Sequence, residues 1–287
     1  MKILILGASG LVGSHLFVEA QKRGHHVIGT YREQFRENLV PFESSHIEAF
    51  RDMLEQQSPD AVIDCCSWTW VDGCQRQPEK AFGENAILPS ERAGMAFGKG
   101  VRYVYVSTSY VFRGDERTYG EESDPAPVNL YGASKLEGEN LIQAATECSS
   151  LIVRSMGVYG KERQRKNFLY QVIDTLGIGK PMRVACDQFG NFTHAGDLAE
   201  GILMLLESDR DGIWNVAGPD PLERRSDIAR KIASLHGLDA NLIVDTPTDE
   251  LGQEAPRPVY AGLSNKKIAS ALGFSAREIA DAMPLEP

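Results

Sequence analysis

A tyrosine and a lysine stand four positions apart in the segment "NLYGASKLEGEN", residues 129–140. The segment predicts a helix, and residues i and i+4 share a helix face, so the side chains of Tyr131 and Lys135 should point the same way. A cation about 4 Å from the phenol contributes about 4 kcal/mol at an effective dielectric constant of about 20, which is roughly three pKa units. We therefore expect Lys135 to bring the pKa of Tyr131 from about 10 toward about 7, where a tyrosine can exchange a proton with a carbonyl or an alcohol.

A run of hydroxyl residues precedes this pair in "VYVSTSYVFRG", residues 104–114. A hydroxyl at the carboxyl end of a buried strand can hydrogen-bond a reacting carbonyl and stabilise charge that develops on its oxygen. We expect Thr108 to do so, with Ser109 as the second choice. Each motif alone is weak, because turns and solvated helix faces also carry such residues.

Three glycines, Gly7, Gly10 and Gly13, follow the first apolar run in "LILGASGLVGSHL", residues 4–16. Such glycines allow a tight strand-to-helix turn, close approach of the backbone to a pyrophosphate, and close packing of the helix on the strand. Ser9 stands where most dinucleotide dehydrogenases have a second glycine. The turn predicts a dinucleotide site.

The second strand ends in "IGTYRE", residues 28–33, without the acidic residue that usually binds the ribose 2′-hydroxyl of NAD. Arg32 can pair with a 2′-phosphate instead, so NADP(H) is the preferred cofactor. Glu33 directly after it keeps NAD(H) open as an alternative.

These motifs need a scaffold that brings strand ends together. Short apolar runs at 2–6, 25–30, 60–66, 102–108 and 149–155 alternate with helical segments at about 11–23, 47–57, 78–97 and from 131. This alternation predicts an α/β fold with a doubly wound parallel sheet of Rossmann type, whose ligands bind at the carboxyl ends of the strands. We expect a dinucleotide-binding domain at 1–156, also including 190–216, and a smaller α/β substrate-binding lobe at 157–189 and 217–287.

Composition excludes several other classes of protein. The chain of 287 residues has a formal net charge of −10, which argues against a nucleic-acid or anionic-membrane binder. No apolar run approaches the roughly 20 residues of a membrane span. The five cysteines and six histidines show no metal-ligand spacing, so we expect no metal site, reduced cysteines and a cytoplasmic protein.

Taken in order, the motifs resemble those of the extended short-chain dehydrogenase/reductase family. The closest likeness is to the dTDP-4-dehydrorhamnose reductases and related nucleotide-sugar 4-keto reductases. It extends beyond the shared motifs to nearly the whole chain, through "SWTWVDGCQRQPEKAFGENA", "STSYVFRG", "YGASKLEGE", "RKNFLYQVI", "DQFGNFTHAGDLAEGI" and "APRPVYAGLSNKKI".

The resemblance implies a role for each matching residue. Tyr131 would be the proton donor, Lys135 its electrostatic partner and ribose ligand, and Thr108 the carbonyl ligand. The implied cofactor contacts are Gly7, Ser9, Gly10, Leu11, Val12, Gly13, Tyr31, Arg32, Cys65, Cys66, Ser67, Ser107, Tyr131, Lys135, Arg154, Ser155 and Met156. The implied substrate contacts are Trp68, Thr69, Val71, Thr108, Ser109, Gly157, Asn167, Gln188 and Arg257.

The chain departs from the family pattern in the expected sugar pocket. Gly157 replaces a tryptophan, Trp68 and Trp70 replace smaller residues, and "PFE" at 41–43 replaces an Asp-aliphatic pair at the adenine. Trp68 would suit stacking on a sugar or base, whereas packing is an equally good role for Trp70. These changes leave the identity of the sugar open.

Four other features have alternative roles. His194 would either touch substrate or cap the next helix, and Asp197 is expected to begin that helix. The charged loop at 161–166 is either a solvated loop or a diphosphate ligand. Arg257, between two prolines, is the better candidate for an anion ligand because its backbone is stiff.

The leading hypothesis is an NADPH-dependent reductase of a nucleotide-linked keto-deoxysugar, and a homodimer remains open. A dehydratase is disfavoured, because Ser109-Tyr110 replaces the acidic pair of that class. An epimerase of the same fold remains an alternative. So does a non-catalytic NADP-binding regulatory subunit similar to the β-subunit of methionine adenosyltransferase.

Overall fold

A parallel sheet forms the centre of the molecule. The structure is a computed structural model that describes residues 1–33, 35 and 37–282. In that part of the chain, seven strands pair in the order β10-β7-β5-β4-β1-β2-β3, and every neighbouring pair is parallel. The strands are β1 (Lys2–Leu6), β2 (His26–Tyr31), β3 (Leu39–Pro41), β4 (Ala61–Asp64), β5 (Arg102–Thr108), β7 (Leu151–Ser155) and β10 (Gly212–Asn215). The chain order reverses between β1 and β4, which is where ligands bind in doubly wound folds. The predicted fold class is confirmed.

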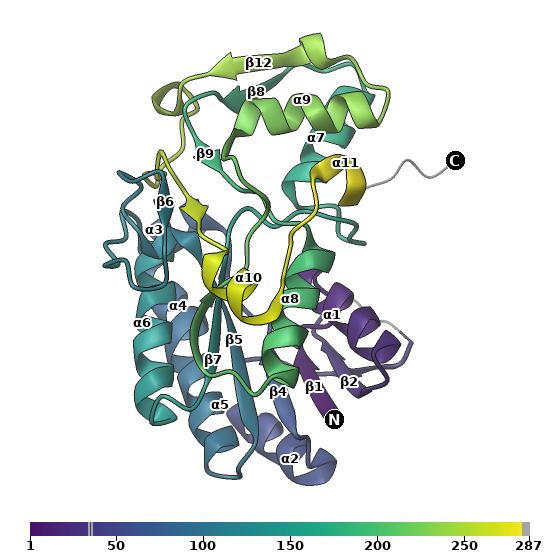
Figure 1. Cartoon of the computed structure of the whole chain (residues 1–287), viewed down its shortest axis with the longest axis vertical. Helices are drawn as coiled ribbons and strands as arrows, with labels where there is room; N and C mark the ends of the chain where they lie inside the picture. The colour runs from purple at the N-terminus through teal and green to yellow at the C-terminus, as the bar shows by residue number, and fades with distance from the viewer. Residues whose placement is uncertain (34, 36, 283–287) are drawn as a thin grey trace.

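Helices cover both faces of this sheet (Figure 1). Successive residues of a strand point to opposite faces, and β1 shows this clearly. Ile3 and Ile5 belong to the core under α1 (Leu11–Lys22), α8 (Ala195–Glu207) and α10 (Lys266–Leu272). Leu4 and Leu6 belong to the core under α2 (Ile47–Gln57), α5 (Leu88–Phe97) and α6 (Leu130–Ala145).

A smaller lobe lies at one end of the molecule, above the sheet in Figure 1. Its core packs α7 (Phe168–Gly177) and α9 (Arg225–Leu235) against the parallel pair β8 (Met182–Ala185) and β12 (Ile243–Thr246). Shorter elements complete it: β9 (Phe189–Gly190), β11 (Glu223–Arg224), α11 (Ile279–Ala282) and the 3₁₀ turns Ala240–Leu242 and Thr248–Glu250.

The borders between the two parts are interleaved. Helix α8 packs on α1, and β10 is the edge strand beside β7. Within the expected stretch 217–287, β13 (Gly262–Leu263) pairs with β6 (Thr118–Tyr119). The side chains of Ile268 and Phe274 join the core that contains β1. Residues of the expected smaller lobe therefore also pack on the larger part, which differs from the expected border at 217. Residues 283–287 of that stretch lie outside the described residues.

The predicted helix at 78–97 consists of three consecutive pieces. Helix α4 (Pro78–Phe82) follows α3 (Val71–Arg76) and runs into a π-helical turn at Gly83–Ile87 before α5 begins. Pro89 in the first turn of α5 has no N–H to donate to the carbonyl four residues back, that of Asn85. The Asn85 carbonyl instead accepts a hydrogen bond from the Tyr105 hydroxyl.

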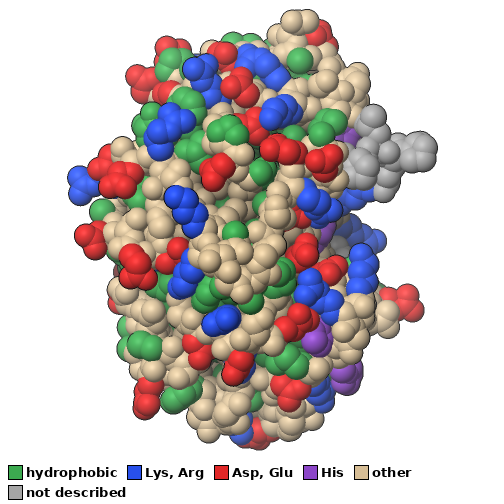
Figure 2. Space-filling model, viewed as in Figure 1, with side chains coloured by type: hydrophobic (Ala, Val, Ile, Leu, Met, Phe, Trp, Pro, Cys, Tyr) green, Lys and Arg blue, Asp and Glu red, His purple; other side chains and the backbone are tan. Residues whose placement is uncertain are grey.

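The surface in Figure 2 carries acidic and basic side chains interspersed over both parts of the molecule. In the described part of the chain, no helix combines the length and the apolar character needed to cross a bilayer.

Candidate active site

The glycine turn joins β1 to α1 with the geometry that a dinucleotide site needs. Gly7 has φ +74°, a conformation that residues with a side chain rarely adopt, and its N–H donates to Thr30 Oγ1 at 3.0 Å. A Cβ on Gly13 would overlap the carbonyl group of Gly7. Gly10 is the N-cap of α1 and offers no side-chain cap. The positive end of α1 therefore faces the cleft with backbone N–H groups available to an anion.

A cleft of about 520 Å³ lies above this turn. Its wall contains Tyr131, Lys135 and Thr108 together with all three glycines. A smaller hollow of about 220 Å³ adjoins it and shares Gly7, Gly10, Cys65 and Ser67 with it. The hollow extends past the end of β2 to Thr30, Tyr31, Arg32, Glu33 and Phe42. The structure thus brings the predicted catalytic residues and the predicted cofactor turn into one continuous space.

Local contacts fix where α6 begins and hence where Tyr131 points. Asn129 is the N-cap, and its Oδ1 accepts a hydrogen bond from the Gly132 N–H at 2.8 Å. A side chain on Gly132 would overlap the carbonyl group of Tyr110. The first turn of α6 therefore packs directly on the segment after β5. The rings of Tyr110 and Tyr131 meet edge to face, 5.8 Å apart.

The expected effect of Lys135 on Tyr131 is wrong for the protein alone. Burial raises the pKa of the Tyr131 phenol above its ordinary value, and the neighbouring Thr108 hydroxyl lowers it only in part. The phenol is therefore protonated at neutral pH. Tyr131 and Thr108 line the same cleft, as a shared site for one carbonyl oxygen requires.

The Lys135 ammonium is held beside the strand ends. Its Nζ donates to Ser67 Oγ at 3.0 Å and to the Val106 carbonyl at 2.7 Å, and it lies 3.9 Å above the Tyr105 ring. Burial lowers the pKa of Lys135 to about 7, although Asp64 and Glu139 act to raise it. The lysine therefore changes charge close to neutral pH.

Two buried ion pairs flank this lysine. Arg92 binds Asp64 at 2.8 Å, and the Tyr103 hydroxyl donates to the same carboxylate. Arg154 pairs with Glu139, which also accepts from Ser107 Oγ. Arg154 is only 1% exposed and does not line the cleft. The structure therefore places the Arg154 guanidinium in the core, whereas a cofactor contact was expected from it.

Asn85 is a site residue that the sequence analysis missed. Its side chain bridges the N–H and C=O of Trp68 and donates to Ser134 Oγ at 3.0 Å. Its carbonyl, freed by the π-helical turn, accepts from the Tyr105 hydroxyl. Asn85 thus fixes the strand end at 67–69 against α6. The signal was present in the sequence, since Pro89 four residues later removes the usual helical donor.

Most of the remaining expected residues line the two spaces. Those in the cleft or hollow are Ser9, Leu11, Val12, Tyr31, Cys65, Cys66, Ser67, Thr69, Val71, Ser107, Ser155, Met156, Gly157 and Asn167. The lining also includes Val106, Tyr110, Glu162, Gln164, Lys166 and Arg225, which were not expected individually. Part of the charged loop at 161–166 therefore faces the cleft.

Three of the expected substrate contacts, Trp68, Ser109 and Gln188, do not line the cleft or the hollow. The ring of Trp68 lies by Gly73, with Lys80 Nζ 4.5 Å from its centroid. Ser109 begins a 3₁₀ turn (Ser109–Val111) and is 1% exposed. Gln188 Nε2 donates to Thr248 Oγ1 at 3.0 Å inside the smaller lobe.

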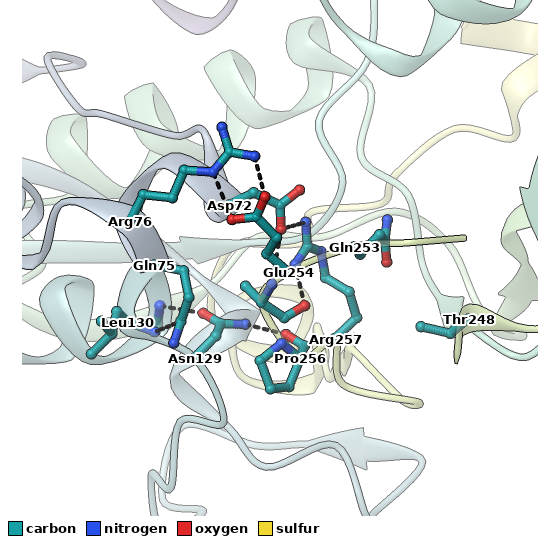
Figure 3. Close-up of polar contacts among 12 residues, drawn as sticks. Asp72, Gln75, Arg76, Asn129, Leu130, Thr248, Gln253, Glu254, Pro256 and Arg257 are labelled. Carbon is teal, nitrogen blue, oxygen red and sulfur yellow. Dashed lines mark hydrogen bonds and ion pairs between the residues drawn. The ribbon is translucent and has the colours of Figure 1, made fainter. Parts of the chain in front are cut away.

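Arg257, the fourth expected substrate contact outside the cleft lining, has a guanidinium that is already paired. Figure 3 shows it beside Asp72 of α3, whose carboxylate accepts from Arg257 Nη2 at 2.9 Å. Arg257 Nη1 donates to the Ala255 carbonyl at 2.6 Å. Arg76 pairs with Glu254 next to it, and Asn129 Nδ2 donates to the Pro256 carbonyl at 2.9 Å. Arg257 thus belongs to a clasp, which we define as residues 72, 76, 129 and 254–257, that joins the two parts of the molecule.

Neighbouring side chains determine the surroundings of Arg32 and Gly157. Arg32, 53% exposed at its side chain, pairs with Glu33 at 3.1 Å, and both residues line the hollow at the end of β2. Gly157 has φ +50°, and a Cβ there would overlap the ring of Phe192. A tryptophan at position 157 would not fit without movement of that ring.

His194 caps α8, because its Nδ1 accepts from the Gly196 N–H at 3.2 Å. Asp197 lies in the first turn of α8 and pairs with Arg277. Both roles are the structural alternatives named above. His194 lies in a separate hollow of about 700 Å³ between α1, α8 and the loop at 161–163. Within residues 1–33, 35 and 37–282, no three His, Cys, Asp or Glu side chains are grouped as a metal site would need.

The sequence is similar to a known protein family and to several curated proteins. The family described as "RmlD substrate binding domain" matches residues 1–285. A curated protein named "Probable low-salt glycan biosynthesis reductase Agl14" from Haloferax volcanii is 31% identical over 98% of this chain and 95% of its own length. A dTDP-4-dehydrorhamnose reductase from Mycobacterium tuberculosis is 30% identical over 94% of this chain and 87% of its own. The "Methionine adenosyltransferase 2 subunit beta" of Xenopus laevis is 28% identical over 93% and 81%.

Solved structures agree. A dTDP-4-dehydrorhamnose reductase from Clostridium acetobutylicum superposes with a TM-score of 0.89 at 29% identity and covers 98% of this chain and 96% of its own. A Bacillus anthracis dTDP-4-dehydrorhamnose reductase in complex with NADP has a TM-score of 0.86 at 28% identity and covers 96% and 94%. The chain therefore belongs to the RmlD substrate binding domain family, among the extended short-chain dehydrogenases/reductases.

Proposed function

We propose that this protein is an NADPH-dependent reductase of a nucleotide-linked 4-keto-deoxysugar. The observation that carries the proposal is that Tyr131, Thr108 and Lys135 line the same cleft as the glycine turn. The relatives named as reductases and the neighbour crystallised with NADP support the reaction class and the cofactor. The chain acts on a carbonyl group as an oxidoreductase.

The residues divide the work as follows. NADPH, when bound, supplies a hydride to the ketone carbon. Thr108 donates a hydrogen bond to the carbonyl oxygen, and Tyr131 transfers its phenolic proton to that oxygen as negative charge develops there. The product is an alcohol, and the phenolate left on Tyr131 regains a proton from solvent. Because burial raises the pKa of Tyr131, the phenol is already in the protonated form that reduction requires.

Other residues hold the cofactor. The N–H groups in the first turn of α1 bind its pyrophosphate, and Lys135 with Ser67 holds its ribose. Arg32 pairs with the 2′-phosphate once it exchanges Glu33 for this ligand. The ionic pair that it gives up is exposed and therefore weak.

The test is NADPH oxidation, followed at 340 nm, with a panel of nucleotide-linked 4-keto-6-deoxysugars and with the corresponding 4-hydroxy sugars as controls. Stoichiometric NADPH loss with one keto sugar, and formation of the hydroxy sugar, is the expected result. Conversion of a hydroxy sugar to its stereoisomer without net NADPH loss would establish an epimerase instead.

The match to a methionine adenosyltransferase β-subunit favours one rival, a regulatory subunit without catalysis. NADPH binding without turnover of any keto sugar in the panel would support it and would contradict the reductase.

A further inference from the structure

Arg225 is a cleft arginine whose guanidinium has no counter-ion in the part of the chain that the structure describes. It is the first residue of α9, in the smaller lobe, and it lines the cleft with Tyr131, Thr108 and Asn167. Among residues 1–33, 35 and 37–282, no carboxylate lies within 4.0 Å of its guanidinium, and its side-chain N–H groups have no hydrogen-bond acceptor.

The contrast with Arg257 makes this unusual. Arg257 has a carboxylate partner, Asp72, and a carbonyl partner within the clasp shown in Figure 3. Burial lowers the pKa of the Arg225 guanidinium, Tyr110 raises it, and the like charge of Arg257 lowers it. Arg225 also lies at the positive end of α9, where a cation is disfavoured. The fold therefore holds Arg225 at a position that does not favour its charge.

Aromatic rings hold the guanidinium in place. Its central carbon lies 4.0 Å above the centroid of Phe168 and 5.9 Å from that of Phe192. Phe192 packs where a Gly157 side chain would stand. Stacking on two rings orients the planar guanidinium but leaves its N–H groups for a ligand.

We propose that Arg225 binds the diphosphate of the nucleotide-sugar substrate; this rests on the proposed function. A diphosphate supplies the missing negative charge and matches the forked geometry of a guanidinium. The proposed function assigns the cofactor's own phosphates to other residues, the turn at Gly7–Gly13 and Arg32, which line the far side of the cleft and the adjoining hollow. Arg225 reaches the cleft from α9 of the smaller lobe, so the anion that it binds would be distinct from the cofactor's phosphates.

The experiment is calorimetric titration of nucleoside diphosphates (dTDP, UDP and GDP) into protein saturated with NADP⁺, so that the cofactor site is filled. For the diphosphate that binds wild type, Arg225→Gln should weaken affinity by about 10- to 100-fold, the range expected for charge-assisted hydrogen bonds. The matching nucleoside without phosphates should bind wild type and variant equally. Arg224→Gln is the control, because this neighbouring arginine is exposed and outside the cleft. It should retain affinity within about twofold.

Stability separates a binding role from a packing role. Arg225→Gln should melt at the same temperature as wild type or higher without ligand, because it removes an uncompensated charge. A lower melting temperature with unchanged diphosphate affinity would show that Arg225 only packs on Phe168, and would overturn the proposal. Arg225→Lys keeps the charge but not the fork, and should recover part of the affinity.

Failure of the two proposals can be told apart. Wild type that binds a diphosphate through Arg225 but reduces no keto sugar contradicts the reductase alone. Wild type that reduces a keto sugar, with affinity unchanged in Arg225→Gln, contradicts the Arg225 proposal alone. Wild type that binds no nucleoside diphosphate and reduces no keto sugar contradicts both.

Discussion

Binding of NADPH should draw a proton onto Lys135 when the pH is above neutral. The pKa of Lys135 is about 7 in the protein alone, lowered by burial. The ribose hydroxyls and the phosphates of a bound cofactor stabilise the ammonium form, so its pKa should rise on binding. The perturbation is therefore the cofactor itself, and the affected group is one ammonium that is 1% exposed.

The magnitude follows from the pKa of about 7. About one tenth of Lys135 is protonated at pH 8, about half at pH 7 and about nine tenths at pH 6. If the complex is fully protonated, NADPH binding takes up about 0.9, 0.5 and 0.1 proton at these three values. NADP⁺ should cause a smaller uptake, because its positive nicotinamide disfavours the ammonium.

The assay is isothermal titration of NADPH at each pH in buffers of different ionisation enthalpy, which yields the number of protons exchanged. Lys135→Met should bind more weakly and show no uptake at pH 8. Lys166→Met is the matched control, since it removes an exposed ammonium from the wall of the same cleft. It should keep the uptake. No uptake at pH 8 in wild type, or equal uptake in Lys135→Met, would refute the reasoning.

Stability gives a second view of the same group. The pKa of Lys135 is lowered in the folded protein, so the unfolded chain binds more protons between about pH 7 and 10.5. The free energy of unfolding should therefore rise with pH across this window, by up to about 1.4 kcal/mol per pH unit from this group. Below about pH 7 the folded protein must bury Lys135 in its charged form, so there Lys135 destabilises the folded state most. Urea titrations at pH 7 and 9 should show this rise in wild type and a smaller one in Lys135→Met.

Three further predictions follow from single contacts. Gly13→Ala should lower the free energy of unfolding by about 2–4 kcal/mol in chemical denaturation, because the new Cβ would overlap the backbone of the glycine turn. Gly83→Ala is the control: a Cβ there has no atom within 4 Å, so the free energy of unfolding should stay the same or rise. Arg32→Ser should raise the KM for NADPH at least tenfold with little change for NADH, whereas Glu33→Gln should lower it a few-fold by freeing Arg32; equal effects on both cofactors would contradict this. Arg257→Met should lower the free energy of unfolding by about 1–3 kcal/mol through loss of its bonds to Asp72 and the Ala255 carbonyl, with diphosphate affinity within about threefold of wild type; a large loss of affinity would restore it as a ligand.

The parts of the site that sequence predicts are those governed by local rules. Parallel strands end at one edge of a sheet, so Thr108 at the end of β5 and the glycines after β1 meet there whatever conformation the loops adopt. Helical periodicity places Tyr131 and Lys135 on one face of α6, and both line the cleft. Each of these placements follows from a few consecutive residues.

The structure differs from the sequence-based predictions where residues far apart in the chain determine burial and pairing. The Tyr131 pKa was predicted from one charge pair, whereas burial of the phenol outweighs it in the structure. Arg257 was expected at an anion because of its flanking prolines, yet its partner Asp72 is 185 positions away in the chain. Arg225 has no periodic or motif signal, and only tertiary packing shows that it lines the cleft without a counter-ion. Burial and long-range pairing are properties of the fold and leave no short sequence pattern.

The central claim, that Tyr131 hands its proton to a carbonyl oxygen, is tested most directly by single-turnover oxidation of bound NADPH in Tyr131→Phe. We expect the variant to bind NADPH with unchanged affinity and to slow hydride transfer to the keto sugar by at least about a hundredfold. Tyr110→Phe, which removes a hydroxyl one ring away, should slow it by less than about tenfold. Hydride transfer at the wild-type rate in Tyr131→Phe would contradict the account.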